Sequence, residues 1–354
     1  MSQQPQNIAI IGAGITGLCS AYTMLEDGHG VTLYDPAGFP ADNASFMAGG
    51  MLAPLAEIEH MPHEWIEAGL GSIALWAKFA EKHGDGLGFD FRQNGSLLLA
   101  HEEDRYILQR FAAHLPAGKG EYTATSELEP ALAEKFPQGL YLAEEAHINP
   151  APAMHALCDY LKAAGVTFIQ EKADPTAISA QYDHVLDCRG MGAAWEDKNL
   201  RGVKGEIVIV HNTELALNRP VRLMHPCYPL YIVPRPDHIF MIGATIIESS
   251  DNTQVSIRSG LELLSALYSL HPSFSEAEII EVKAGIRPSY PDNLPRIEIS
   301  KNDNIIRCNG LFRHGFMLSP IIGRCVADHI AGGQNNFLNL LKKDRDEHHH
   351  QRAA

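Results

Sequence analysis

The sequence lacks closely spaced cysteines. Its six cysteines stand at positions 19, 158, 188, 227, 308 and 325, none of them forms a C-x-x-C motif, and several lie inside apolar runs. This spacing argues against a disulfide framework and predicts buried free thiols in a reducing compartment.

Long apolar runs and an excess of basic side chains are missing as well. No apolar run approaches the roughly 18 residues that a membrane-spanning helix needs. The 28 Lys and Arg residues are outnumbered by 43 Asp and Glu residues, which gives a net charge of -15 and argues against nucleic acid or anionic membranes as partners. The N-terminus also lacks the basic and apolar regions of a signal peptide, so we expect a cytoplasmic protein.

What is present is an ordinary globular composition. Apolar residues make up 45% of the 354 residues and charged residues 20%. This length is enough for about two domains with a substantial core.

The most informative stretch is residues 7–35. Ile8 to Ile11 predicts a buried strand, residues 18–25 a helix, and residues 31–34 a second strand that ends at Asp35. Between the first strand and the helix, the sequence follows the G-x-G-x-x-G spacing with Gly12, Gly14 and Gly17.

Each part of this pattern has a mechanical reason. Gly12 allows a tight turn, Gly14 lets a pyrophosphate approach the backbone, and Gly17 lets the helix pack closely on the sheet. Asp35 lies 23 residues after Gly12, where a carboxylate can accept hydrogen bonds from ribose hydroxyls. We therefore predict a dinucleotide site; the alternative, an ordinary βαβ turn, does not explain Asp35.

The later segments suggest two interleaved domains. Strand and helix patterns like those of the N-terminus return near residue 150, whereas residues 205–243 predict antiparallel strands. Strands are also expected at residues 89–91 and 96–100, flanking an Asn-Gly turn, and a last helix at residues 318–331. We expect a nucleotide domain from residues 1–85, 146–202 and 301–340, and a substrate domain from residues 86–145 and 203–300.

The end of the chain, residues 341–354, is predicted to be a flexible tail. It contains three adjacent histidines, His348, His349 and His350. Adjacent histidines do not fix a coordination geometry, so we predict no metal site.

Several motifs together resemble a known family. They are the glycine fingerprint with Asp35, AGGMLAP at residues 48–54, DCRGMGA at 187–193, YIVPR at 231–235, MIGAT at 241–245, AGIRPSYPDNLP at 284–295 and NGLFRHGFMLSP at 309–320. In this order they resemble the FAD-dependent amino-acid oxidases of the D-amino-acid oxidase superfamily, and among them the glycine oxidases of thiazole (thiamine) biosynthesis.

The resemblance implies an α/β fold, a glutathione-reductase-like FAD-binding domain with an antiparallel β-sheet substrate domain. It also implies non-covalent FAD. The residues that it assigns to the cofactor are Gly12, Gly14, Ile15, Thr16, Gly17, Asp35, Ala44, Ser45, Gly49, Gly50, Met51, Ala173, Gly190, Leu311, Phe312, Arg313, His314, Gly315, Phe316 and Met317.

For the substrate, the resemblance points to three residues. Arg287 matches the arginine that grips the substrate carboxylate, and Arg313 and Tyr231 would lie near the same pocket. Arginine suits this task because its planar guanidinium can donate two parallel hydrogen bonds to a carboxylate. From the residues alone, Arg313 could equally form a structural ion pair, and Tyr231 could be a core residue.

One position departs from the family pattern. Pro229 stands two residues before the tyrosine of YIVPR, where glycine oxidases of the family can have a histidine. His225 is nearby in sequence, but its spacing does not place it in the pocket.

The implied reaction is oxidative deamination of glycine or a related small amino acid. A hydride would pass from the substrate Cα to flavin N5, and molecular oxygen would be reduced to hydrogen peroxide. Two alternatives stay open: a D-amino-acid dehydrogenase with another electron acceptor, and a non-catalytic flavin-binding protein. A homo-oligomer also stays open as the assembly.

Overall fold

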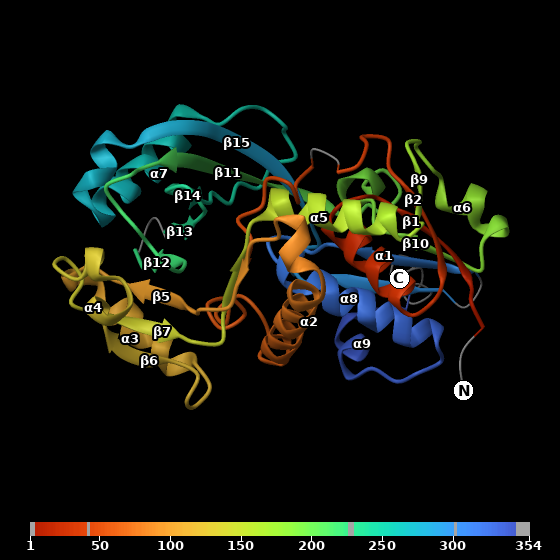
Figure 1. Cartoon of the computed structure of the whole chain (residues 1–354), viewed down its shortest axis with the longest axis horizontal. Helices are drawn as coiled ribbons and strands as arrows, with labels where there is room; N and C mark the ends of the chain where they lie inside the picture. The colour runs from red at the N-terminus through yellow and green to blue at the C-terminus, as the bar shows by residue number, and fades with distance from the viewer. Residues whose placement is uncertain (1–3, 41–42, 226–229, 301–302, 345–354) are drawn as a thin grey trace, which may run out of the picture.

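The structure, a computed structural model, describes residues 4–40, 43–225, 230–300 and 303–344. Two large sheets organise the chain, with the seven-stranded sheet on the right of Figure 1 and the eight-stranded sheet on the left. Expected features at Cys227, Pro229 and the three tail histidines lie outside the described residues.

The seven-stranded sheet has the order β18-β16-β17-β10-β1-β2-β9. Its parallel core confirms that segments near residues 1–35 and 165–190 share one sheet. The strands are β1 (Asn7–Ile11), β2 (Gly30–Tyr34), β9 (Thr167–Ile169), β10 (His184–Asp187), β16 (Arg296–Ile299), β17 (Ile305–Asn309) and β18 (Lys342–Asp344).

The eight-stranded sheet has the order β15-β11-β14-β13-β12-β5-β7-β6 and is antiparallel except where β12 meets β5. Its long strands β11 and β15 run together toward the other sheet (Figure 1). The strands are β5 (Ser96–Leu99), β6 (Glu121–Ala124), β7 (Gln138–Leu142), β11 (Arg201–His211), β12 (Val221–Leu223), β13 (Leu230–Pro234), β14 (Ile239–Gly243) and β15 (Glu278–Ser289).

A third, small sheet has the order β3-β8-β4, with β3 at Met51–Leu52, β4 at Phe91–Arg92 and β8 at Ala146–Ile148. Here the structure corrects a prediction. The strands on either side of Asn94-Gly95 do not pair with each other, because β4 pairs with β8 whereas β5 pairs with β7 and β12.

Helices cover the sheets. They are α1 (Ile15–Glu26), α2 (Glu64–Leu87), α3 (Arg105–His114), α4 (Thr125–Leu128), α5 (Pro150–Ala163), α6 (Pro175–Ile178), α7 (Ile257–Leu270), α8 (Gly315–Ile330) and α9 (Asn336–Leu341). Short 3-10 turns occupy Glu102–Asp104, Pro130–Leu132, Ser179–Gln181, Gly190–Ala193 and Pro272–Glu276. No helix in the described segments has the length and apolar character needed to span a membrane.

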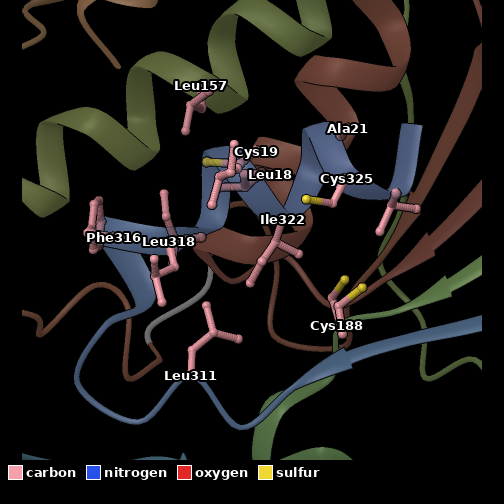
Figure 2. Packing of buried hydrophobic residues seen from close by; sticks show 14 of the residues in the cluster. Leu18, Cys19, Ala21, Leu157, Cys188, Leu311, Phe316, Leu318, Ile322 and Cys325 are labelled. Carbon is pink, nitrogen blue, oxygen red and sulfur yellow. The ribbon is translucent and has the colours of Figure 1, made fainter. Parts of the chain in front are cut away.

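The main core lies where α1 and α8 cross. Figure 2 shows Leu18 and Cys19 of α1 close to Ile322 and Cys325 of α8. The two helices approach so closely that a Cβ on Gly323 would lie 3.2 Å from Ser20 Cα. Thr16 Oγ1 and Ser319 Oγ, 3.1 Å apart, join them by a hydrogen bond. This crossing brings both helix N-termini to the same region.

Helix α8 begins three residues earlier than predicted, despite the proline that it contains. Pro320 has no N–H with which to bond the carbonyl of Phe316, four residues earlier. Trp76 Nε1 donates to that carbonyl instead, at 2.8 Å. The missing helix bond is therefore replaced by a buried side chain, which sequence periodicity does not reveal.

Five cysteines, at 19, 158, 188, 308 and 325, are buried and free, as predicted.

Two strands lie outside the segments that we expected to form the nucleotide domain. Strand β16 lies within residues assigned to the substrate domain, yet it pairs with β17 of the seven-stranded sheet. The predicted flexible tail includes β18, which pairs with β16. The end of the assigned substrate segment and the start of the assigned tail therefore join the seven-stranded sheet.

Two helical glycines are expected to respond in opposite directions to alanine. A Cβ on Gly17 would lie 1.9 Å from Gly12 O, so Gly17→Ala should lower the free energy of unfolding by about 3 kcal/mol or more. A Cβ on Gly260 of α7 would meet nothing within 4 Å, so Gly260→Ala should raise it by about 0.5–1 kcal/mol. Urea unfolding measures both; equal effects would contradict the packing described.

Candidate functional site

A cavity lies between the two large sheets. It holds about 1820 Å³ of unfilled space, including its open mouth. The predicted residues that line it are Gly12, Gly14, Ile15, Thr16, Asp35, Ala44, Ser45, Gly49, Gly50, Met51, Gly190, Tyr231, Arg287, Leu311, Phe312, Arg313, His314, Gly315, Phe316 and Met317.

Two predicted cofactor residues do not line this cavity. Gly17 faces the carbonyl of Gly12, so its small size serves the packing of α1. Ala173 is buried in a cluster with Ala9, Tyr34 and Val185. The resemblance assigned to the cofactor a backbone group near Ala173, in a region where the match to the family is loose.

The glycine loop has the geometry of a phosphate site. Gly12 has φ +107°, and a Cβ there would lie 2.4 Å from Cys188 O. Helix α1 begins at Ile15, and its N-cap residue, Gly14, has no side chain with which to cap it. The N–H groups left free at a helix start and its partial positive charge attract an anion.

Asp35 closes one end of the site. Its Oδ2 accepts a hydrogen bond from Ala13 N at 2.7 Å, and its Oδ1 accepts one from Ala37 N at 2.8 Å. Ser45 Oγ similarly accepts from Ile15 N at 3.1 Å. Each carboxylate oxygen keeps a lone pair for a ribose hydroxyl. The loop, the helix start and Asp35 therefore fit the pyrophosphate and ribose of FAD.

A half-buried arginine shapes the neighbouring wall. Arg235 donates to Gly49 O at 2.5 Å and to Ile148 O at 2.7 Å. Burial lowers the pKa of Arg235 to about 10. Gly50 has φ +73°, and a Cβ there would lie 2.0 Å from Ile148 O. Arg235 therefore holds the glycine segment that lines the cavity, a role that the YIVPR motif alone does not indicate.

The segment from Leu311 to Met317 forms another wall. His314 precedes α8, is buried, and has a pKa lowered to about 4 chiefly by burial, so its imidazole is neutral at neutral pH. No side chain among the described residues caps α8. The free N–H groups at the start of α8 and the positive end of the helix dipole therefore favour negative charge in this part of the cavity.

Arg287 lies on β15 and lines the cavity. Its guanidinium lies directly over Gly205 of β11, where a Cβ would come within 2.2 Å of the Arg287 Cζ. Its Nη1 donates to Thr245 O at 3.1 Å. Burial lowers its pKa, and in the described part of the chain no carboxylate forms an ion pair with it. This cation is therefore available to an anionic ligand.

Arg313 also lines the cavity, but its charge is matched. Its Nη2 donates to a carboxylate oxygen of Glu57, which lines the cavity too. Burial acts to raise the pKa of Glu57, but Arg313 and its cationic neighbours outweigh this effect and lower it. The structure thus shows an ion pair for Arg313, and Glu57 is a site residue that sequence reasoning missed. Its only signal was an acid that ends an apolar stretch, with a second acid, Glu59, two residues later.

Behind Glu57 lies a fully buried carboxyl group. Glu145 Oε1 accepts from Ala56 N at 2.7 Å, and its other oxygen is hydrogen-bonded to Ser96 Oγ. Arg222 Nη1 donates to Ala56 O. Both backbone polar groups of Ala56, the residue before Glu57, are therefore held by side chains.

The remaining predicted substrate residue is Tyr231 of β13. It is half-buried, lines the cavity and lies opposite Gly243 of β14. His225 does not line the cavity.

Comparison with known proteins gives a family match. The model of the family described as DAO, FAD dependent oxidoreductase, matches residues 7–329. A putative thiamine biosynthesis oxidoreductase ThiO of Rhizobium etli is 38% identical over 321 residues, covering 90% of this chain and 95% of that protein. A glycine oxidase of Bacillus licheniformis is 27% identical, covering 96% and 97%.

A solved structure shows the same fold. The crystal structure of glycine oxidase from Geobacillus kaustophilus matches with a TM-score of 0.81 at 24% identity, covering 94% of this chain and 96% of that one. The match confirms the predicted fold class.

The buried carboxyl of Glu145 should make stability depend on pH. Burial, its foremost cause, raises the pKa of Glu145 to about 7 from an ordinary value of 4.5. Between these values the folded state binds more protons than the unfolded state, so stability falls as pH rises. Glu145→Gln should remove a destabilisation that reaches about 3 kcal/mol above pH 7.

The measurement is urea unfolding of the wild type and the variant between pH 4.5 and 8. Glu144→Gln is the control, because Glu144 is adjacent but exposed and pairs with Lys119. A difference between wild type and Glu145→Gln that does not change with pH would contradict the prediction.

Proposed function

The chain belongs to the DAO family of FAD-dependent oxidoreductases, and from that membership we propose that it oxidises glycine or a related small amino acid. The observation that carries the proposal is Arg287, a cation without a carboxylate partner among the described residues, in the cavity that the glycine loop also lines. The names of the relatives from Rhizobium etli and Bacillus licheniformis support this substrate and a place in thiamine biosynthesis.

The chemistry of the reaction belongs to the cofactor. When bound, FAD would supply the flavin that accepts a hydride from the substrate Cα and would pass the two electrons on to dioxygen, giving hydrogen peroxide. The glycine loop and Asp35 would hold its pyrophosphate and ribose, and residues 44–51 and 311–317 its flavin end.

The task of Arg287 is to bind and orient the substrate. A guanidinium can grip a carboxylate with two parallel hydrogen bonds, which fixes the direction in which Cα points. Partial burial of Arg287 strengthens this attraction because less water screens it. Tyr231 lines the same part of the cavity and would limit the room for a side chain.

The uncapped start of α8 would stabilise negative charge. Its N–H groups and the positive end of its dipole need no proton transfer to act. The neutral His314 beside it adds no charge that would compete with Arg287 for the carboxylate. An amino acid bound with an uncharged amine would need no separate general base.

The proposal predicts a yellow holoprotein that oxidises small amino acids. Under anaerobic conditions, glycine or sarcosine should bleach the flavin absorbance, and in air they should yield hydrogen peroxide. Bleaching without peroxide, but with reduction of an artificial dye, would indicate a dehydrogenase. FAD binding without bleaching by any D-, L- or N-methyl amino acid would refute the proposed activity.

Replacing Arg287 by lysine should separate substrate binding from cofactor binding. Arg287→Lys keeps the charge but loses the paired hydrogen bonds, each worth about 1.5–3 kcal/mol. We expect FAD to stay bound while the substrate constant rises by roughly two to four orders of magnitude. Steady-state kinetics and the flavin spectrum measure both; unchanged kinetics would show that another group holds the carboxylate.

A further inference from the structure

Three arginines line the cavity, and among the described residues only Arg287 lacks a carboxylate partner. Arg189 forms ion pairs with two carboxylates. Arg313 is paired with Glu57, and the two side chains are 18% and 19% exposed. Arg287 donates to the backbone carbonyl of Thr245. Arg313, Glu57 and Arg287 interact electrostatically, because the positive charge of Arg313 lowers the pKa of Arg287 while Glu57 raises it.

The charges of Arg287, Arg313 and ionised Glu57 add up to +1. This arrangement leaves a single net positive charge for a ligand. A substrate with one carboxylate matches it. The other cationic side chains that line the cavity, Arg189, Lys283 and Arg313, are each paired with a carboxylate of the protein. A second carboxylate that paired with Arg313, the one of these cations that interacts with Arg287, would meet the charge of Glu57 at close range.

We propose that Glu57 sets the substrate class by restricting the site to amino acids with one carboxylate and excluding dicarboxylic amines. This inference rests on the proposed function. Glu57 is a specificity-determining residue that acts through Arg313: it neutralises a cation that would otherwise bind a second acid group.

The backbone around Glu57 is built to keep it in place. The N–H of Ala56 is bound by Glu145 and its carbonyl by Arg222, and both side chains are buried. The carbonyl of Glu57 accepts from His60 N at 2.8 Å. These bonds hold the backbone of Glu57 in place and keep its carboxylate within reach of Arg313, so a second carboxylate would have to replace an existing ion pair.

The test is the variant Glu57→Gln, which keeps the shape and a hydrogen-bond acceptor for Arg313 but removes the negative charge. The holoenzyme is titrated with acetate and with malonate, succinate and glutarate, and binding is followed by the change in flavin absorbance. These acids are not oxidised, so binding is measured without turnover. Glu59→Gln is the matched control, because Glu59 lies two residues away and does not line the cavity.

We expect Glu57→Gln to bind at least one dicarboxylate 10- to 100-fold more tightly than the wild type, with a much smaller change for acetate. The double variant Glu57→Gln/Arg313→Gln should lose this gain, and Glu59→Gln should never show it. Absence of a gain for all three dicarboxylates would overturn the proposal, and so would a gain that persists in the double variant.

Turnover supplies a second readout. The ratio of kcat/KM for iminodiacetate to that for glycine should rise at least tenfold in Glu57→Gln, and an unchanged ratio would contradict the proposal.

If the wild type oxidises no amino acid, the proposed function fails, but the binding titrations still test the role of Glu57. If Glu57→Gln does not fold, Arg313→Gln tests the same pair: the unpaired Glu57 should weaken acetate binding about tenfold, and unchanged binding would overturn the proposal.

Discussion

The site depends on a guanidinium that the fold keeps in a cavity without a carboxylate partner among the described residues. Arg287 can lie there because Gly205, on the paired strand, has no side chain to occupy the same space. Burial lowers its pKa, which is the physical sign that holding this charge costs free energy. An anionic ligand offsets that cost. The folded protein therefore places a partly desolvated cation where a carboxylate can bind it.

A second constraint is the close approach of segments that are far apart in the chain. Helices α1 and α8 cross where Gly323 meets Ser20, and the N-termini of both helices line the same cavity. The N–H groups of Ala13 and Ile15 donate to Asp35 and Ser45, which fixes the cofactor end of the cavity. Arg235 fixes the wall formed by residues 49–50. The cavity is thus shaped by backbone groups and short side chains that leave little room for rearrangement.

The sequence predicted those features that a local pattern encodes. The glycine spacing, Asp35 and Arg287 each belong to a motif whose residues are constrained by their neighbours in the chain. Glu57 and Glu145 were not predicted, because each acts through a partner far along the chain, Arg313 and Ala56 respectively. The early start of α8 was missed for the same reason, since Trp76 supplies the hydrogen bond that Pro320 cannot. Gly17 was predicted to allow close packing, and the structure shows that contact with Gly12.

The most direct test of this account is a crystal structure of the FAD-bound protein soaked with acetate, an acid that it cannot oxidise. The account predicts the flavin ring between residues 44–51 and 311–317, and both acetate oxygens within hydrogen-bond distance of the Arg287 guanidinium. A flavin ring elsewhere, or an acetate bound to Arg313 while Arg287 keeps only its contact with Thr245, would contradict it.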